Sequence, residues 1–115
     1  MATHQLLVFS TPAEGREDEY NQWYDTVHLG EVLQIPGFTA AQRYRVELAP
    51  GSPAFQRYLA VYEVEADDPS EVLSRLGAAR STMTMTDAFD SASTRRLVVS
   101  PVGERQTADT ADARS

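Results

Sequence analysis

The order of hydrophobic periodicities along the chain limits its fold more than any other feature. Residues 4–10 are a short apolar run that ends at a Thr-Pro pair, which is typical of a strand stopped by a turn. Residues 38–48 alternate with period two, and residues 55–66 are rich in β-branched and aromatic side chains. The Gly/Pro-rich stretch between them predicts a hairpin loop. Residues 95–102 complete the pattern with a fourth strand.

A helix is expected between the first two strands. Three acidic residues lie shortly after Gly15, where a helix start favours negative charge, and Gly15 itself can cap the helix. The spacing i, i+3, i+4, i+7 then places four side chains on one face, which should pack on a sheet: Tyr20, Trp23, Tyr24 and Val27. We expect Gly30 to weaken this helix and Pro36-Gly37 to end the helical turn that follows.

A second helix is expected after the third strand. Asp68 suits a helix cap and Pro69 suits a position near the helix start. The apolar side of this helix should consist of Val72, Leu73 and Leu76. Residues 81–94 are rich in Ser and Thr but include Met and Phe, so both a helical extension and a loop fit them.

The resulting order, β-α-β-β-α-β, predicts an α+β domain with a four-stranded antiparallel sheet and both helices on one face. The domain spans residues 1–102, and the small polar residues 103–115 predict a flexible tail. The face of the sheet away from the helices has too many apolar side chains to be left in water. We therefore expect a second copy of the chain to cover it.

Composition argues against several classes of function. The net charge of −7 disfavours binding to nucleic acid or to an anionic membrane surface. The absence of cysteine removes disulfides, thiolate nucleophiles and cysteine-based metal sites. No apolar segment approaches the length of about 20 residues that spans a membrane, and no basic residue precedes the short apolar run at the start. These features predict a cytoplasmic protein that binds a small molecule.

His28 and Asp25 are the candidate catalytic residues. On a regular helix His28 lies about 80° from Tyr20, at the border of the aromatic stripe, and Asp25 lies about 60° from His28. Histidine moves protons near neutral pH and a neighbouring acid can orient it, so the two predict an acid–base pair. The alternative is that His28 stabilises the end of the helix and that Asp25 is simply solvated.

No metal or cofactor is expected. His4 is the only other histidine, and it is either a surface residue at a strand end or a residue directed toward a pocket. The two histidines lack the spacing of a metal site. The sequence also lacks a phosphate-binding glycine loop and a serine-nucleophile motif.

A substrate-binding surface is expected from aromatic and polar side chains on related faces of the sheet: Gln42, Tyr44, Tyr58 and Tyr62. Together with Trp23 and Tyr24 of the first helix, they could bind a hydrophobic ligand and donate hydrogen bonds to its oxygens. Met83, Met85 and Phe89 predict an adaptable pocket wall. The alternative for all of these residues is ordinary core or interface packing.

With this order of elements around it, the stretch 20–38, YNQWYDTVHLGEVLQIPGF, resembles the EthD-like branch of the dimeric α/β-barrel (ferredoxin-like) superfamily. The likeness rests on the aromatic, acid-bearing helix, the histidine near its end, the LGEVL turn and the IPGF entry into a strand. Related sequences often have Pro where this chain has Gly30. The resemblance implies a homodimer with its sheets face to face and a pocket between each sheet and its helices. It also implies that His28 is catalytic.

We therefore expect a small cofactor-independent enzyme of lyase or isomerase type, namely a cyclase, dehydratase, isomerase or decarboxylase. Its substrate would be a hydrophobic cyclic or polyketide-like carbonyl compound. His28 would be the acid or base, Asp25 its partner, and the sheet tyrosines donors to a developing oxyanion. The alternatives are a cofactor-free or haem-binding monooxygenase of the same fold and a non-catalytic ligand-binding dimer.

Overall fold

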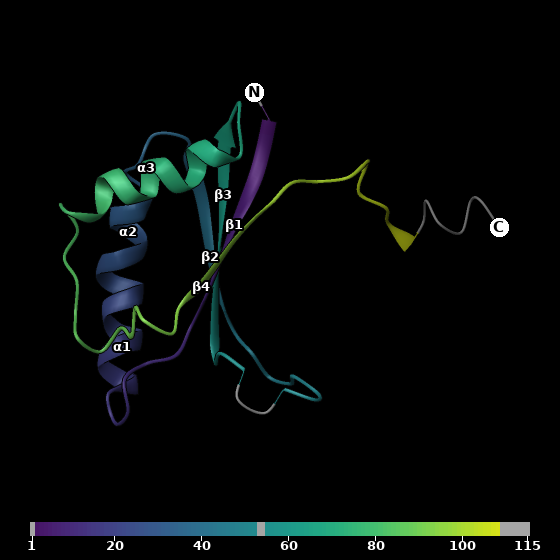
Figure 1. Cartoon of the computed structure of the whole chain (residues 1–115). Coiled ribbons are helices and arrows are strands. Elements are labelled where there is room, and N and C mark those ends of the chain that lie inside the picture. The colour runs from purple at the N-terminus through teal and green to yellow at the C-terminus, as the bar shows by residue number, and fades with distance from the viewer. Residues whose placement is uncertain (1, 53–54, 109–115) are drawn as a thin grey trace.

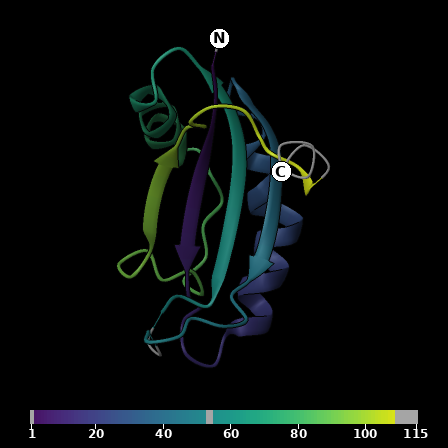
Figure 2. The same ribbon diagram turned by 90° about the vertical axis from the view of Figure 1, so that its right-hand side faces the viewer.

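The computed structural model describes residues 2–52 and 55–108 and confirms the β-α-β-β-α-β order. The four strands form one antiparallel sheet in the order β2-β3-β1-β4, with both helical segments on one side of it (Figure 1). Figure 2 shows the sheet from its other face. The elements are β1 (Ala2–Ser10), α1 (Glu17–Trp23), η1 (Tyr24–His28), α2 (Leu29–Val32), β2 (Phe38–Arg45), β3 (Tyr58–Ala66), α3 (Ser70–Arg80) and β4 (Arg95–Val99).

A bulge in β2 changes which of its side chains face the helices. Phe38 lies opposite Val64, but Ala40 lies opposite Glu63, so one extra residue is inserted at Thr39. Because side chains alternate between faces, each side chain of β2 after the bulge points to the opposite face from the one it would have in a regular strand. An uninterrupted alternation over residues 38–48 would place Phe38, Gln42 and Tyr44 on one face, whereas the bulge places Phe38 on the face opposite to Gln42 and Tyr44.

The core fills the space between the sheet and the helices. β1 and β3 supply alternate residues, and the expected stripe of the first helix supplies aromatic rings that are almost fully buried. The largest of these buried side chains are Tyr20, Tyr24, Tyr62 and Leu6. The residues on the other face of β1 and β3 are only partly covered or exposed.

The first helix continues into the short helical turn that the sequence predicted after Gly30. Gly30 does not interrupt it, and helical structure continues through α2 to Val32. The chain then turns at Gly37, whose φ of +91° favours glycine and where a Cβ atom would lie 2.6 Å from the Glu65 carbonyl oxygen. Pro36-Gly37 is thus the true end of this segment, as the sequence predicted.

The second helix matches the prediction except on one side. The backbone N–H of Ser70 donates to Asp68 at 2.9 Å, so Asp68 acts at the start of α3 as expected. Val72 is buried and Leu76 packs on the core, but Leu73 is 44% exposed. Leu73 lies one residue past Val72, about 100° around the helix, which turns it toward solvent.

Residues 81–94 form a strap without regular structure that crosses from α3 to β4. Three contacts hold it to the first helix: Trp23 Nε1 donates to the Thr84 carbonyl at 2.8 Å, the Thr84 N–H donates to Glu31 at 2.8 Å, and the Thr86 hydroxyl donates to Glu19 at 2.7 Å. The strap brings Phe89 into the core. Of the two alternatives for this segment, the loop is therefore correct.

The C-terminal segment leaves the domain after β4 and runs away from the sheet (Figure 1). Residues 109–115 of the predicted tail lie outside the described residues. None of the helices within the described ranges is both long and apolar enough to cross a membrane.

Candidate active site

The site is built around a widened helical turn. Residues 24–28 form a π-helix, and the Leu29 N–H donates to the carbonyl of Tyr24, five residues back. In a regular helix Trp23 and His28 would lie about 140° apart around the axis, whereas an i, i+5 turn places them side by side. The imidazole of His28 therefore stacks on the Trp23 ring, with centroids 4.5 Å apart and planes 21° apart. This turn moves His28 from the border of the stripe into the interior.

His28 is buried and neutral. Its side chain is 8% exposed, and among the described residues Nδ1 has no hydrogen-bond partner. Burial is the main cause that lowers the pKa of His28 from 6.5 to about 4, and the positive charges of Arg80 and Arg96 lower it further. Glu31 acts in the opposite direction. At neutral pH the imidazole is uncharged and can accept a proton.

Asp25 does not contact His28. Its carboxylate pairs with Arg43 Nη1 at 2.8 Å, and its side chain is 59% exposed. Arg43 faces the helices because of the bulge in β2, and its guanidinium lies 4.5 Å from the centre of the Tyr24 ring. The expected acid–base pair is therefore not formed, because the π turn carries His28 inward while Arg43 holds Asp25 at the surface. Glu31 is the acid that influences His28.

A small cavity adjoins His28. Its volume is about 30 Å³, which is room for about one water molecule. Most of its lining is apolar, and its polar lining comes from His28, Tyr62, Arg80 and Arg96. The remaining wall consists of Val8, Val32, Leu76, Met83, Met85 and Phe89. Met85 and Phe89, which the sequence predicted as pocket wall, are thus in place.

Tyr62 and Tyr24 bring two further unpaired polar atoms to this region. Each hydroxyl is buried and forms no hydrogen bond of regular geometry within the described part of the chain, although the two phenols are close enough for each to affect the pKa of the other. Burial raises the pKa of Tyr62 to about 12, and it raises the pKa of Tyr24 well above its usual value. Both phenols stay protonated at neutral pH and remain available as donors. Of the two, only Tyr62 lines the cavity, and a buried hydroxyl without a regular hydrogen bond beside His28 points to a ligand.

The other predicted substrate-binding residues lie elsewhere. Tyr58 faces the helices but contacts Glu17 and Asn21 at the edge of the sheet. Tyr44 and Gln42 lie opposite Leu59 and Val61, on the face away from the helices. The expected cluster of sheet tyrosines was therefore wrong, because it assumed a β2 without a bulge.

His4 has a structural role. Its side chain is buried, Nδ1 lies 2.6 Å from the Ser100 hydroxyl, and Nε2 lies 3.1 Å from the Ala66 carbonyl oxygen. Both ring nitrogens thus have partners at the end of the sheet. His4 is therefore neither a surface residue at a strand end nor a residue directed toward a pocket, which were the two alternatives from the sequence.

Sequence reasoning missed Arg80 and Arg96. Arg96 lies opposite Val8, on the side of β4 that faces the helices. A charged residue at the inward position of a strand was the available signal, since such positions are usually apolar. That signal became readable only when the register of β4 against β1 was known.

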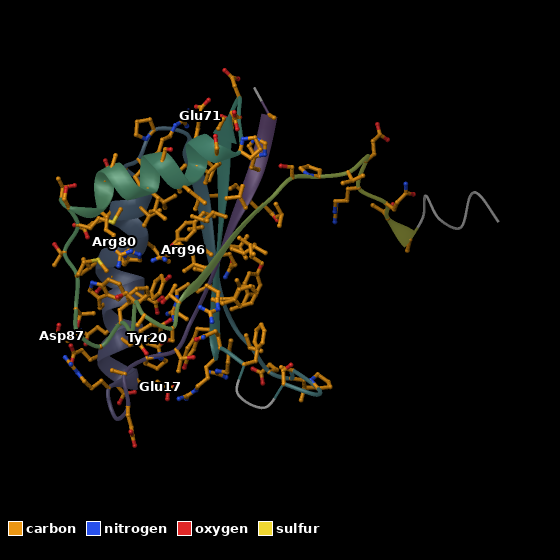
Figure 3. The ribbon with its side chains drawn as sticks, in the orientation of Figure 1. Glu17, Tyr20, Glu71, Arg80, Asp87 and Arg96 are labelled. Carbon is orange, nitrogen blue, oxygen red and sulfur yellow. The ribbon has the colours of Figure 1, made fainter. Side chains whose placement is uncertain are left out.

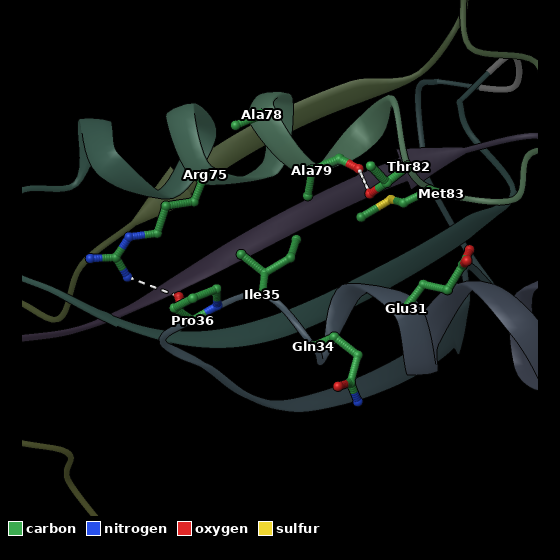
Figure 4. Close-up of a pocket in the computed structure, with 9 residues that line it drawn as sticks. All are labelled: Glu31, Gln34, Ile35, Pro36, Arg75, Ala78, Ala79, Thr82 and Met83. Carbon is green, nitrogen blue, oxygen red and sulfur yellow. Dashed lines mark hydrogen bonds between the residues drawn. The ribbon is translucent and has the colours of Figure 1, made fainter.

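An open groove lies next to the cavity, between α3 and the segment that contains α2 (Figure 4). Its volume is about 550 Å³, which is within the usual size for a small-molecule site. Ile35 and Ala79 line its apolar floor, and Glu31 and Arg75 lie along its length. Met83 lines both the groove and the cavity. The side chain of Met83 is thus a wall that the two spaces share.

No protein-family model and no curated protein matches the sequence. Solved structures do match. An EthD family protein from Bacillus halodurans is 15% identical, with 92% of this chain and 100% of that chain covered and a TM-score of 0.57. A dimeric ferredoxin-like protein of unknown function from Jannaschia is 9% identical, with coverages of 86% and 99% and a TM-score of 0.59. The chain has their fold.

A third structure, the haem degrader MhuD from Mycobacterium tuberculosis with two haems bound, is 16% identical, with coverages of 90% and 99% and a TM-score of 0.57. At such identities the likeness concerns fold and carries no activity across. The α+β ferredoxin-like architecture expected from the order of elements is confirmed. The chemistry has to be argued from the site itself.

Proposed function

We propose that the protein is a small acid–base enzyme that removes a proton from a hydrophobic carbonyl compound. The observation that carries the proposal is the pairing, at one cavity, of an uncharged imidazole with an unpaired phenol. His28 would accept the proton from the carbon next to the carbonyl group. Tyr62 would donate a hydrogen bond to the oxygen on which negative charge develops. Glu31 would stabilise the imidazolium that forms.

The size of the cavity limits how a substrate binds. Only a carbonyl group and its neighbouring atoms fit beside His28, so the body of the substrate would lie in the groove between α2 and α3. Met83 would move aside to join the two spaces, which its unbranched side chain allows. Proton removal of this kind begins cyclisation, dehydration, isomerisation and related reactions of cyclic or polyketide-like compounds.

Proton removal can be measured without knowing the product. Wild-type protein is incubated in D₂O with a panel of cyclic ketones such as 2-tetralone, and exchange of the α-hydrogens is followed by proton NMR. His28→Gln should abolish the catalysed exchange, and Tyr62→Phe should slow it about 10- to 100-fold. Tyr58→Phe and Asp25→Asn are the controls, because both residues lie outside the cavity, and both variants should exchange at the wild-type rate.

Two results would contradict the proposal. One is exchange by His28→Gln at the wild-type rate, and the other is wild-type protein that accelerates exchange of no ketone in the panel. Binding of the ketones without exchange would favour a non-catalytic ligand-binding protein.

A cofactor-free monooxygenase is the second candidate. The observation that favours it is the aromatic wall of the site, formed by Trp23 and Phe89, around the base that would create an electron-rich carbanion. Oxygen consumption in the same incubations, dependent on His28, would distinguish this reaction. The arrangement does not fit a haem, because the space beside His28 is about 30 Å³ and one face of the imidazole is covered by Trp23.

We also propose that the protein is a homodimer through the open face of the sheet. This face carries apolar side chains from three strands: Leu7, Phe9, Leu59, Val61, Leu97 and Val99. Leu97 is 53% exposed, and Phe55 adds its ring next to Phe9 with centroids 5.3 Å apart. Apolar patches of this kind usually mark an interface. The ferredoxin-like neighbour from Jannaschia is dimeric, which supports a dimer for this chain as well.

A further inference from the structure

Two arginines in the site have no partner. Five of the arginines in this chain form ion pairs with carboxylates at 2.6 to 3.5 Å: Arg16, Arg43, Arg45, Arg57 and Arg75. Among the described residues, the guanidinium groups of Arg80 and Arg96 form no hydrogen bond or ion pair. Arg95 and Arg105 also form no ion pair among the described residues, but neither of them lines the cavity. Arg80 is exposed to water, whereas Arg96 is partly buried without a carboxylate beside it.

The two side chains meet at the cavity. Arg80 is the last residue of α3, and Arg96 projects from the inward side of β4, so the two approach from different elements (Figure 3). Both line the cavity together with His28, and its lining includes no carboxylate. Arg96 is partly buried, and its pKa is lowered first by burial and then by the charge of Arg80. Arg80 itself is exposed, so the destabilising charge is that of Arg96, which is partly buried and repelled by Arg80 unless an anion joins them.

We propose that Arg80 and Arg96 bind a carboxylate of the substrate at the mouth of the His28 cavity. A carboxylate is planar and has two oxygens that can accept from two guanidinium groups. The apolar remainder of the wall suits a hydrophobic body. The inference rests on the proposed function and sharpens it, since the substrate becomes a hydrophobic carbonyl compound that also carries a carboxylate.

Carboxylate binding would also act on the base. Arg80 and Arg96 both lower the pKa of His28, and the groups that face its imidazole with charge are these two arginines and Glu31. A bound carboxylate offsets the two positive charges, which makes the imidazole a stronger base. His28 would then be fully active only when the bound substrate places its carboxylate between Arg80 and Arg96.

The experiment compares an anion with its neutral isostere. Binding of 2-naphthoate and of 2-naphthamide to the wild-type protein is measured by isothermal titration calorimetry. We expect 2-naphthoate to bind at least about tenfold more tightly, and we expect Arg80→Gln and Arg96→Gln to remove this preference. Arg95→Gln is the matched control. It changes the net charge equally, but Arg95 lies opposite Phe9 on the other face of the sheet, so the preference should remain.

Several results would overturn the inference: no binding of 2-naphthoate by the wild-type protein, equal affinity for the two probes, or an equal loss in Arg95→Gln. Inorganic phosphate is a third probe, and Arg96-dependent binding of phosphate without a preference for 2-naphthoate would also overturn it. Without ligand, the melting temperature of Arg96→Gln should equal or exceed that of Arg95→Gln, because an unpaired charge is removed. A clear decrease would indicate a structural role and contradict the inference.

The outcome is separable from that of the proposed function. His28→Gln should still prefer 2-naphthoate, because both arginines remain. If His28→Gln loses proton exchange but still prefers 2-naphthoate, the result bears on the role of His28 and leaves the carboxylate site intact. If the wild-type protein shows no preference for 2-naphthoate over 2-naphthamide, only the proposed carboxylate site is contradicted, and proton removal by His28 is not.

Discussion

At the scale of single residues, the candidate site contains buried polar groups that lower the stability of the fold. His28, Tyr24 and Tyr62 each bury a polar atom without a regular hydrogen bond in the described structure, and His28 and Tyr62 line a cavity that holds about one water molecule. Elsewhere in the core, polar side chains are paired, as for Tyr20 with Ser10. The contrast separates groups that hold the fold together from groups that are available to a ligand.

The buried state of His28 predicts a dependence of stability on pH. Its pKa is about 4 when folded, against about 6.5 when unfolded, so the unfolded chain takes up a proton first as the pH falls. The free energy of unfolding should therefore decrease between pH 6.5 and 4, and at pH 5 His28 should account for about 2 kcal/mol of the loss. Urea unfolding followed by the fluorescence of Trp23 at pH 7 and pH 5 measures this. His28→Gln should lack this part of the decrease, and an identical decrease in both proteins would contradict the burial of a neutral imidazole.

At the scale of elements, the π turn is what joins Trp23 to His28. Such a turn behaves as one extra residue in an α-helix, and removing that residue should restore i, i+4 spacing between the two rings. Thr26 is suited to removal because it is exposed and its hydroxyl only donates to the Gln22 carbonyl within the same helix. After removal of Thr26, the residues before and after it would still point to the same sides of the helix.

We therefore expect the chain with Thr26 deleted to fold and to retain the near-ultraviolet circular dichroism of the stacked Trp23. Deletion of Ser74, an exposed residue of the regular helix α3, is the control. It rotates the rest of α3 by about 100° and separates Leu76 from the core, so its melting temperature should fall much further. If deletion of Thr26 and deletion of Ser74 lower the melting temperature equally, the π turn does not behave as one extra residue in an α-helix.

At the scale of the whole molecule, the two faces of the sheet have different roles. The inner face carries the core and the cavity, and the outer face carries apolar side chains that the proposed dimer would bury. Leu97→Glu should shift the protein from dimer to monomer in size-exclusion chromatography with light scattering, because it places a charge in a desolvated interface. Leu73→Glu is the control, since Leu73 is also an exposed leucine but lies on α3. A dimer that persists in Leu97→Glu and dissociates in Leu73→Glu would place the interface on the helices instead.

Sequence periodicity was sufficient for the order of elements, the antiparallel sheet with helices on one face, and the buried aromatic stripe. These follow from local patterns that repeat every 2 or 3.6 residues, and one face of each element has to leave water. Local patterns also singled out His28, Met85 and Phe89, which line one cavity; the catalytic role of His28 stays a prediction. Nothing beyond the local chain was required for them.

The partners of these residues depended on the folded molecule. A one-residue insertion in β2 and a five-residue turn in the first helix each change the facing of every side chain that follows, and neither has a periodic signature in the sequence. For that reason Asp25 pairs with Arg43 and Tyr44 lies on the outer face. Arg80 and Arg96 reach the cavity beside His28 from distant parts of the chain. Contacts across elements are set by register and packing, which local periodicity does not encode.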